Sequence, residues 1–177
     1  MKKAIINVSL IVTTLLIYFL QSNFFSWFNI AGVMPNLFVL LVLFIGLFAT
    51  QTMGTIYGLI VGLVLDFLLG TRVGIYSASL GLIGFLAAIF DKNFSKDSRM
   101  TIMVMGIGAT VIFESLTYLL KYVFAANQLE LLNFVKILAI EVIFNLLLTI
   151  ILYPLLQKFG YYIENEYKGN KILTSYF

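Results

Sequence analysis

Apolar segments occupy almost the whole chain, and this confines it to a lipid environment. The sequence is 62% hydrophobic and only 11% charged, whereas a soluble domain is about a quarter charged. A membrane-spanning helix needs about 20 apolar residues, so 177 residues allow six spans with short loops. We therefore expect an all-α integral membrane protein, folded as a six-helix transmembrane bundle.

The predicted spans form a single transmembrane domain, residues 1–177. Residues 21–34 carry four aromatic residues and no charge, which favours a segment lying in the membrane interface. Pro35 opens the second span, where a missing N–H has no helical partner to lose. Fusion of the second and third spans is the alternative, and polar Gln51 argues against it. A polar cytoplasmic tail is expected over 157–177, and the spans are 4–20, 35–49, 54–69, 75–90, 101–124 and 132–156.

Basic residues are distributed unevenly between the two sides of this topology. Eight of the 11 lysines and arginines fall on the side of the two chain ends, and Arg72, Lys121 and Lys136 fall on the other side. Cytoplasmic loops carry the excess of basic residues, so both termini are expected in the cytoplasm. The most charged stretch, 91–99, is expected to be a solvated cytoplasmic loop.

A stripe of small residues marks the third span, with one residue every four positions. Glycine permits close approach of another helix. Ideal geometry shifts each step by roughly 40°, so the stripe is expected to wind around the helix and only neighbouring members to share a face. The stripe comprises Gly54, Gly58, Gly62, Asp66 and Gly70.

Asp66 has two interpretations. A carboxylate within an apolar helix is costly in lipid and should face protein or trapped water, as a site residue or a partner contact would. Alternatively, it is a polar residue near the helix end that reaches Arg72 or headgroup water.

Glu114 and Glu141 are the other carboxylates within spans. Each lies roughly 15 Å from the connection between the fifth and sixth spans, so the two could meet, with Asn145 one turn below Glu141. A pocket for a partner or ligand, a proton relay and a purely structural hydrogen-bonded network all remain open.

The residue inventory excludes several functions. With no cysteine and no histidine, the chain has no disulfide, thiolate nucleophile, zinc–histidine site or Ser-His-Asp triad. We expect no metal, no cofactor and no catalysis, since no nucleophile–base pair or phosphate-binding loop is visible. A net charge of +3 is too small to indicate nucleic-acid binding.

The order of these features resembles the MreD family, the rod-shape-determining membrane proteins of bacteria. Gly54, Gly58, Gly62, Asp66 and Gly74 match its glycine-rich third span. The other matching positions are Leu20-Gln21-Ser22, Pro35-Asn36-Leu37, Leu63, Tyr76 and Tyr153-Pro154-Leu155. Asn36 stands where an aspartate is common in the family.

The resemblance implies a non-catalytic scaffold of the cell-elongation machinery for peptidoglycan synthesis, in the bacterial cytoplasmic (inner) membrane. The expected partner is MreC, which has an extracellular domain, and contact with MreB and the cell-wall polymerase and transpeptidase is indirect. The family supplies no catalytic residues. Its motif positions and the buried carboxylates become partner-contact or packing candidates: Pro35, Asn36, Gly54, Gly58, Gly62, Asp66, Gly74, Glu114, Glu141 and Asn145.

The family also resembles the substrate-binding subunits of energy-coupling-factor vitamin transporters, which are small six-span bundles with an outward-facing pocket. A vitamin-binding subunit is therefore the alternative function. Many of those subunits carry an alanine-xxx-alanine pattern on the first span, and that pattern is absent here.

Overall fold

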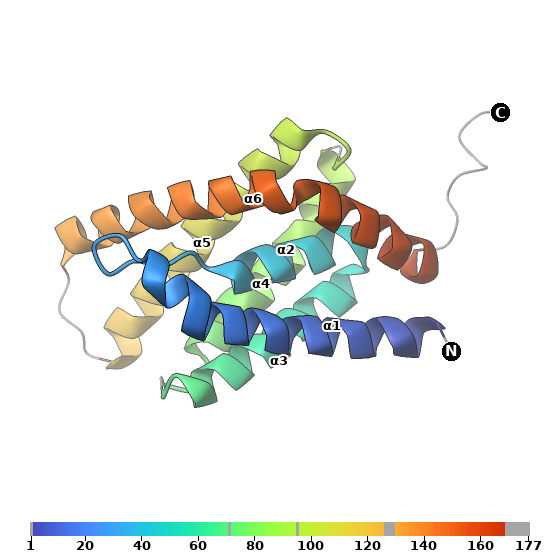
Figure 1. Ribbon diagram of the computed structural model, residues 1–177. Coiled ribbons are helices and arrows are strands. Elements are labelled where there is room, and N and C mark those ends of the chain that lie inside the picture. Colours follow the sequence, from blue (N-terminus) through green and yellow to red (C-terminus); the bar gives the residue numbers. More distant parts are fainter. Residues whose placement is uncertain (1, 71, 95, 126–129, 169–177) are drawn as a thin grey trace.

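The computed structural model describes the chain except residues 1, 71, 95, 126–129 and 169–177 (Figure 1). The described residues form helices joined by turns and short irregular segments, with no strand, which confirms the expected helical membrane protein. The elements are α1 (Lys2–Phe19), η1 (Leu20–Phe24), η2 (Phe25–Phe28), α2 (Leu37–Phe48), α3 (Gln51–Leu68), α4 (Ile75–Asn93), α5 (Arg99–Ala125) and α6 (Leu131–Tyr167).

Four segments among the described residues are long and apolar enough to cross a membrane. They are Lys3–Phe28, Gln51–Leu68, Arg99–Phe124 and Leu131–Tyr167, while α2 and the apolar part of α4 are shorter. The first segment ends at Phe28, inside the predicted interfacial stretch, because η1 and η2 continue α1. The side chain of Trp27, in η2, is 88% exposed. Six crossings remain a prediction.

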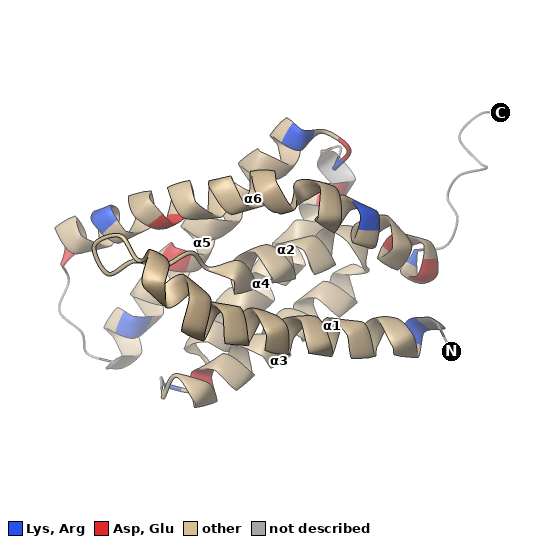
Figure 2. Cartoon of the chain, viewed as in Figure 1, with Lys and Arg blue, Asp and Glu red and all other residues tan. Residues whose placement is uncertain are grey.

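The two described chain ends lie at the same end of the bundle (Figure 1). We call this the terminal end; it also holds the α2–α3 and α4–α5 connections. The opposite, distal end holds the segment between α1 and α2, the α3–α4 turn, the end of α5 and the start of α6. Charged residues gather toward these two ends and leave the middle of the bundle apolar (Figure 2).

Helix α2 is the core of the bundle, and all twelve of its residues are buried. A helix that is apolar on every side must be enclosed by protein or lipid; here the other helices surround it, since α3, α4, α5 and α6 all contact it. The helix begins at Leu37 because Asn36 is its N-cap, accepting a hydrogen bond from the backbone N–H of Val39. Pro35 therefore precedes the cap and is not the first helical residue.

The glycine stripe of α3 lies against the backbone of α4. A Cβ atom at Gly58 would overlap the carbonyl oxygen of Leu80, and one at Gly62 would overlap the backbone of Ser77. All members from Gly54 to Asp66 contact α4, so the expectation that only neighbouring members share a face is wrong. The contact between α3 and α4 therefore runs along the stripe from Gly54 to Asp66. Gly70 stands apart, since it ends α3 with φ +64°.

Three helices meet at glycines on the same contact line. A Cβ atom at Gly54 would overlap Gly46 of α2 and the carbonyl oxygen of Gly84 in α4. Such close approach favours van der Waals contact between backbones, which is the main attraction available to helices in lipid. This junction fixes α3 and α4 against the core helix.

Asp66 holds the start of α4. The N-cap of that helix is Gly74, which has φ +108° and no side chain to satisfy the first helical N–H groups. Asp66 supplies the missing acceptor, with its carboxylate oxygens 2.8 Å from the backbone nitrogen of Gly74, 3.0 Å from that of Tyr76 and 3.2 Å from that of Ser77. The carboxylate is 0% exposed and lies where a helix N-terminus favours negative charge.

Helix α6 is longer than a bilayer is thick and changes direction midway (Figure 1). Its 37 residues include Pro154, which cannot donate the internal hydrogen bond and bends the helix. Residues 157–167, expected as part of a polar tail, are helical, and a Cβ at Gly160 would meet the ring of Phe48.

An ion network closes the terminal end. Lys96 is only 8% exposed and lies 2.7 Å from Asp91 and 2.6 Å from Glu164, so the expectation of a solvated loop is wrong here. Burial alone lowers the pKa of Lys96, but the two carboxylates outweigh it and hold the pKa above its usual value. Lys168 bonds Asp91 and the carbonyl of Leu47, the latter near the C-terminus of α2 where cations are favoured.

Alanine substitution at Gly58 tests the close packing of α3 on α4. Gly58→Ala is expected to destabilise the fold by about 2 kcal/mol, because the methyl group must displace the backbone of α4. Gly108→Ala is the matched control, since that helical glycine has nothing within 4 Å of an added Cβ, and it should be neutral or stabilising by up to about 1 kcal/mol. Thermal unfolding in detergent measures both. Equal behaviour of the two variants contradicts the packing.

Asp66 substitutions test the capping contact. Asp66→Ala leaves three backbone N–H groups near the start of α4 without their acceptor and should cost about 3 kcal/mol. Asp66→Asn keeps one acceptor oxygen and should cost roughly half as much. Unfolding of the alanine variant at the wild-type temperature contradicts this role.

Candidate partner-binding groove

A buried polar network joins α2, α5 and α6 near the distal end. The amide oxygen of Asn145, which is fully buried, accepts a hydrogen bond from the backbone N–H of Asn36 at 2.9 Å. Its amide nitrogen donates to the hydroxyl of Thr110 at 3.0 Å. Gln21 adds a contact from η1, accepting from the N–H of Leu37. The amide side chain of Asn145 therefore ties the start of the core helix to α5.

Glu114 and Glu141 meet one turn farther along the same helices. Their carboxyl groups are hydrogen-bonded to each other, and Glu141 also contacts the side chain of Asn36. Figure 2 shows an acidic position on α5 and one on α6 lying beside each other. A hydrogen bond between two carboxyl groups contains a proton, so at least one member of the pair is protonated. The structure thus brings together the two glutamates, which the sequence analysis expected to lie at similar depth and to be able to meet.

An open groove adjoins this pair between α5 and α6. It has a volume of about 580 Å³. We call it the α5–α6 groove; its lining residues are Glu114, Thr117, Tyr118, Lys121, Tyr122, Glu130, Asn133, Phe134 and Ile137. The rings of Tyr118 and Phe134 stack with centroids 4.4 Å apart. The groove therefore combines acidic groups with aromatic walls.

Two buried polar atoms, one on the groove wall and one on the residue bonded to Glu114 of that wall, have no hydrogen-bond partner within the described chain. They are the hydroxyl of Tyr118 and one carboxyl oxygen of Glu141, which is 5% exposed. An unpaired polar group costs more inside a bilayer than in water, because acyl chains offer it no hydrogen bond. The groove thus holds unmet hydrogen-bonding capacity.

Lys121 is directed to a different neighbour. Its ammonium nitrogen lies 3.4 Å from the hydroxyl of Tyr76 and 5.3 Å from the centre of that ring. Tyr76 in turn packs on Phe113 and lines a second cavity of about 340 Å³. This inner cavity also receives Gln21 and Asn36, so the polar network lies between the two cavities.

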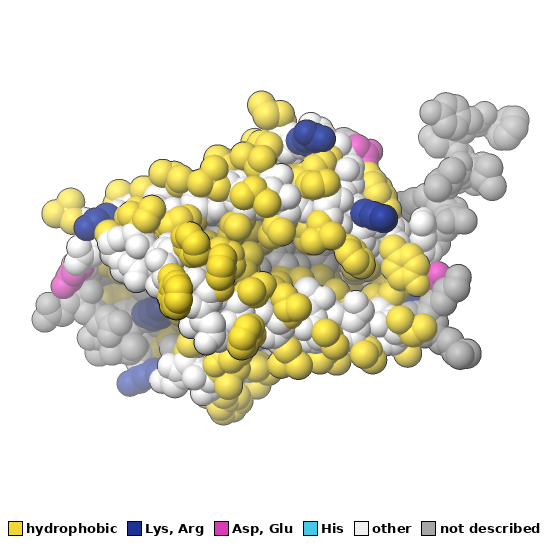
Figure 3. Space-filling view, viewed as in Figure 1, with side chains coloured by type: hydrophobic (Ala, Val, Ile, Leu, Met, Phe, Trp, Pro, Cys, Tyr) yellow, Lys and Arg dark blue, Asp and Glu magenta, His cyan; other side chains and the backbone are white. Residues whose placement is uncertain are grey.

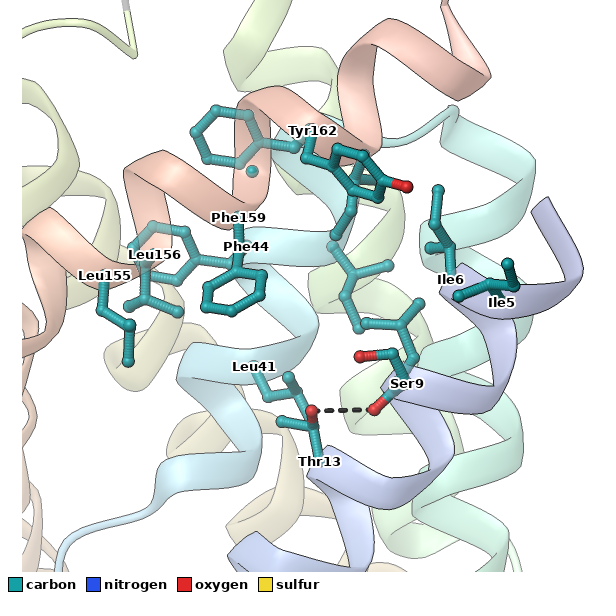
Figure 4. Close-up of a pocket in the computed structure, with 15 residues that line it drawn as sticks. Ile5, Ile6, Ser9, Thr13, Leu41, Phe44, Leu155, Leu156, Phe159 and Tyr162 are labelled. Carbon is teal, nitrogen blue, oxygen red and sulfur yellow. Dashed lines mark hydrogen bonds between the residues drawn. The ribbon is translucent and has the colours of Figure 1, made fainter. Parts of the chain in front are cut away.

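An apolar groove separates α1 from α6 toward the terminal end. It has a volume of about 290 Å³, and Figure 4 shows Ile5 and Ile6 of α1 across from Leu155, Leu156 and Phe159 of α6. Figure 3 shows hydrophobic side chains over most of this face of the molecule. Ser9 and Thr13 are polar residues on its wall, and the hydroxyl of Thr13 is already bonded to the carbonyl of Ser9.

The candidate residues from the sequence divide into two sets. The first serves contacts within the chain between α3 and α4 and contains Gly54, Gly58, Gly62, Asp66 and Gly74. The second surrounds the polar network and contains Pro35, Asn36, Glu114, Glu141 and Asn145.

Sequence reasoning missed Thr110, Tyr118 and the contact between Lys121 and Tyr76. Thr110 lies in an apolar stretch of α5, and its spacing of four from Glu114 was the available signal. Tyr118 continues the same spacing toward the distal end. No group of three or more Asp, Glu, His or Cys residues that could hold a metal ion occurs in the described part of the chain.

Comparison with protein families gives an assignment that agrees with this architecture. The family model described as rod shape-determining protein MreD matches residues 2–163. This range includes the glycine stripe, the polar network, the α5–α6 groove and the inner cavity. Comparisons with curated proteins and with solved structures gave no match. The four long apolar helices fit a multi-pass membrane protein. The chain therefore belongs to the MreD family and is a membrane protein with a role in rod-shape determination.

Proposed function

We propose that the protein is a non-catalytic scaffold of the bacterial cell-elongation machinery that binds MreC in the cytoplasmic membrane. Through MreC it would be connected with MreB and with the cell-wall polymerase and transpeptidase. The observation that carries the proposal, beside membership of the family, is the α5–α6 groove with its unmet polar groups. The vitamin-transporter alternative has no support from the comparisons.

The depth of the groove favours a protein occupant. Glu114 lies eleven residues before Ala125, the last residue of α5, which is about 16 Å along the helix. Polar groups at such depth face protein or enclosed water, because lipid tails cannot satisfy them. A transmembrane helix of a partner, together with the segment that follows it, supplies both apolar surface and hydrogen-bonding groups.

The charge distribution supports a location of this groove on the outer side of the membrane. Basic residues are concentrated at the terminal end, so with six spans that end faces the cytoplasm and the distal end faces outward. The family resemblance implies that the partner, MreC, has an extracellular domain. The groove then faces the segment of MreC that leaves the membrane toward that domain.

The scaffold works by assembly, with the helix packing keeping the groove in a fixed shape. The glycine junction holds α3 and α4 on α2, and Asn145 holds the start of α2 on α6. A partner that fills a preformed groove loses little binding free energy to ordering the receptor.

Photo-crosslinking from within the groove tests the proposal. A photoreactive phenylalanine analogue at Tyr122 or Ile137, which line the groove, should crosslink to MreC in native membranes. The matched control is the same analogue at Val104, an exposed position in the terminal half of the same helix α5, where little or no MreC adduct is expected. Adducts are identified by immunoblotting and mass spectrometry.

Other outcomes of this experiment are equally informative. MreC adducts from Val104 and none from the groove positions contradict the groove as the contact site. The absence of MreC adducts at every position, together with failure of MreC to co-purify, contradicts the scaffold. A vitamin-like molecule that co-purifies at one-to-one stoichiometry favours the transporter alternative.

A further inference from the structure

We propose that the Glu114–Glu141 pair receives one basic side chain, preferably an arginine, from the partner that occupies the α5–α6 groove. This inference rests on the proposed function and adds the chemistry by which the partner is recognised. It assigns the carboxyl pair, the aromatic wall and the unpartnered polar atoms to a single binding site.

The first argument is charge. The hydrogen-bonded pair shares a proton, so it carries one negative charge when the other member is ionised. Among the described residues no lysine or arginine forms an ion pair with either glutamate, since the ion pairs lie at the terminal end. Lys121, the cation of the groove, is close enough to interact with both glutamates through its charge, but its ammonium group is hydrogen-bonded to Tyr76. The pair therefore has no cation in direct contact, and one basic side chain entering the groove would supply it.

The second argument is the unmet hydrogen-bonding capacity. One carboxyl oxygen of Glu141 is buried and has no donor, although Glu141 is bonded to Glu114 on the groove wall. The hydroxyl of Tyr118, on the same wall, is also unpartnered. A guanidinium group presents five N–H donors in one plane, enough to reach both carboxyl groups and the hydroxyl together.

The third argument is the shape of the wall. Tyr118 and Phe134 stack at 4.4 Å, and Tyr122 lines the same groove. Aromatic faces attract cations, and a planar guanidinium packs on them better than an ammonium group does. Glu130 lies at the distal rim, where its side chain is bonded to Asn133 and is exposed. It adds negative charge along the entry path without belonging to the pair.

Isosteric substitutions separate this site from the general scaffold. The double substitution Glu114→Gln/Glu141→Gln removes the charge of the pair and nearly keeps the size of the side chains, whereas either single substitution leaves one carboxyl group that can ionise. The double variant is expected to reduce capture of MreC in nanodiscs by about tenfold or more, and each single variant by less. Glu166→Gln, which removes an acid of α6 at the terminal end outside the groove, should change capture less than about twofold. Thermal unfolding confirms that each variant is folded before capture is compared.

The basic residue itself is located by a double-mutant cycle. Each Lys or Arg in the MreC segment crosslinked from the groove is changed to Gln and combined with Glu114→Gln/Glu141→Gln. The residue that enters the site should lose its effect in the Glu114→Gln/Glu141→Gln background, because its partner charge is already absent. Additive losses for every basic residue overturn the proposal.

A soluble probe distinguishes a partner side chain from a free basic compound. Arginine amide is titrated into the protein without MreC, and thermal unfolding is followed. Stabilisation that requires millimolar or higher concentrations of arginine amide and disappears in Glu114→Gln/Glu141→Gln indicates a site adapted to a tethered side chain. Stabilisation at micromolar concentrations makes a free compound the occupant and overturns the assignment to the partner.

Failure of this inference is distinguishable from failure of the scaffold. If the wild-type protein captures MreC and the Glu114→Gln/Glu141→Gln variant captures it equally well, the cation site is wrong and the scaffold stands. If the wild-type protein captures no MreC, the scaffold is wrong, and lack of any arginine amide effect then overturns the cation site as well.

Discussion

Backbone contact between α3 and α4 is the interaction on which the rest of the structure depends. Lipid tails are as apolar as leucine, so burial provides no drive for helices to associate within the bilayer. Close approach at Gly58 and Gly62 supplies van der Waals contact, and Asp66 adds charged hydrogen bonds to the start of α4. A carboxylate that is expensive in lipid is stable there because the partly positive N-terminus of a helix surrounds it.

The two ends of the bundle are built differently, and this difference suggests their roles. At the terminal end, Lys96 and Lys168 satisfy the carboxylates and the end of α2, so the charges are paired within the chain. At the distal end, the network around Asn145 fixes α2 against α5 and α6, yet Tyr118 and Glu141 keep unpaired atoms. A closed end suits stability, and an open polar groove at membrane depth suits a partner.

Local pattern was sufficient to predict the helices, the small-residue packing face and the approach of Glu114 to Glu141, since both glutamates lie at similar distances from one connection. Periodicity identifies a face but not what covers it, so the pairing of the stripe with α4 was out of reach. The role of Asp66 depends on Gly74 as a cap without a side chain, which becomes visible only when both are placed. The residues around Lys96 have the composition of a solvated loop, and only tertiary packing buries the Lys96 side chain.

Disulfide formation between α3 and α4 tests the central claim most directly, because the chain contains no cysteine of its own. A Cβ at Gly81 would lie against Leu59, so the Leu59→Cys/Gly81→Cys pair should form a disulfide within one chain in native membranes. Ile60→Cys with Gly81→Cys is the control, since the three atoms nearest to a Cβ at Gly81 all belong to Leu59 and none to Ile60. A rapid shift to a crosslinked monomer for the first pair alone is the predicted result. Crosslinking only between two chains, or none at all, would show that the glycine face packs against something other than α4.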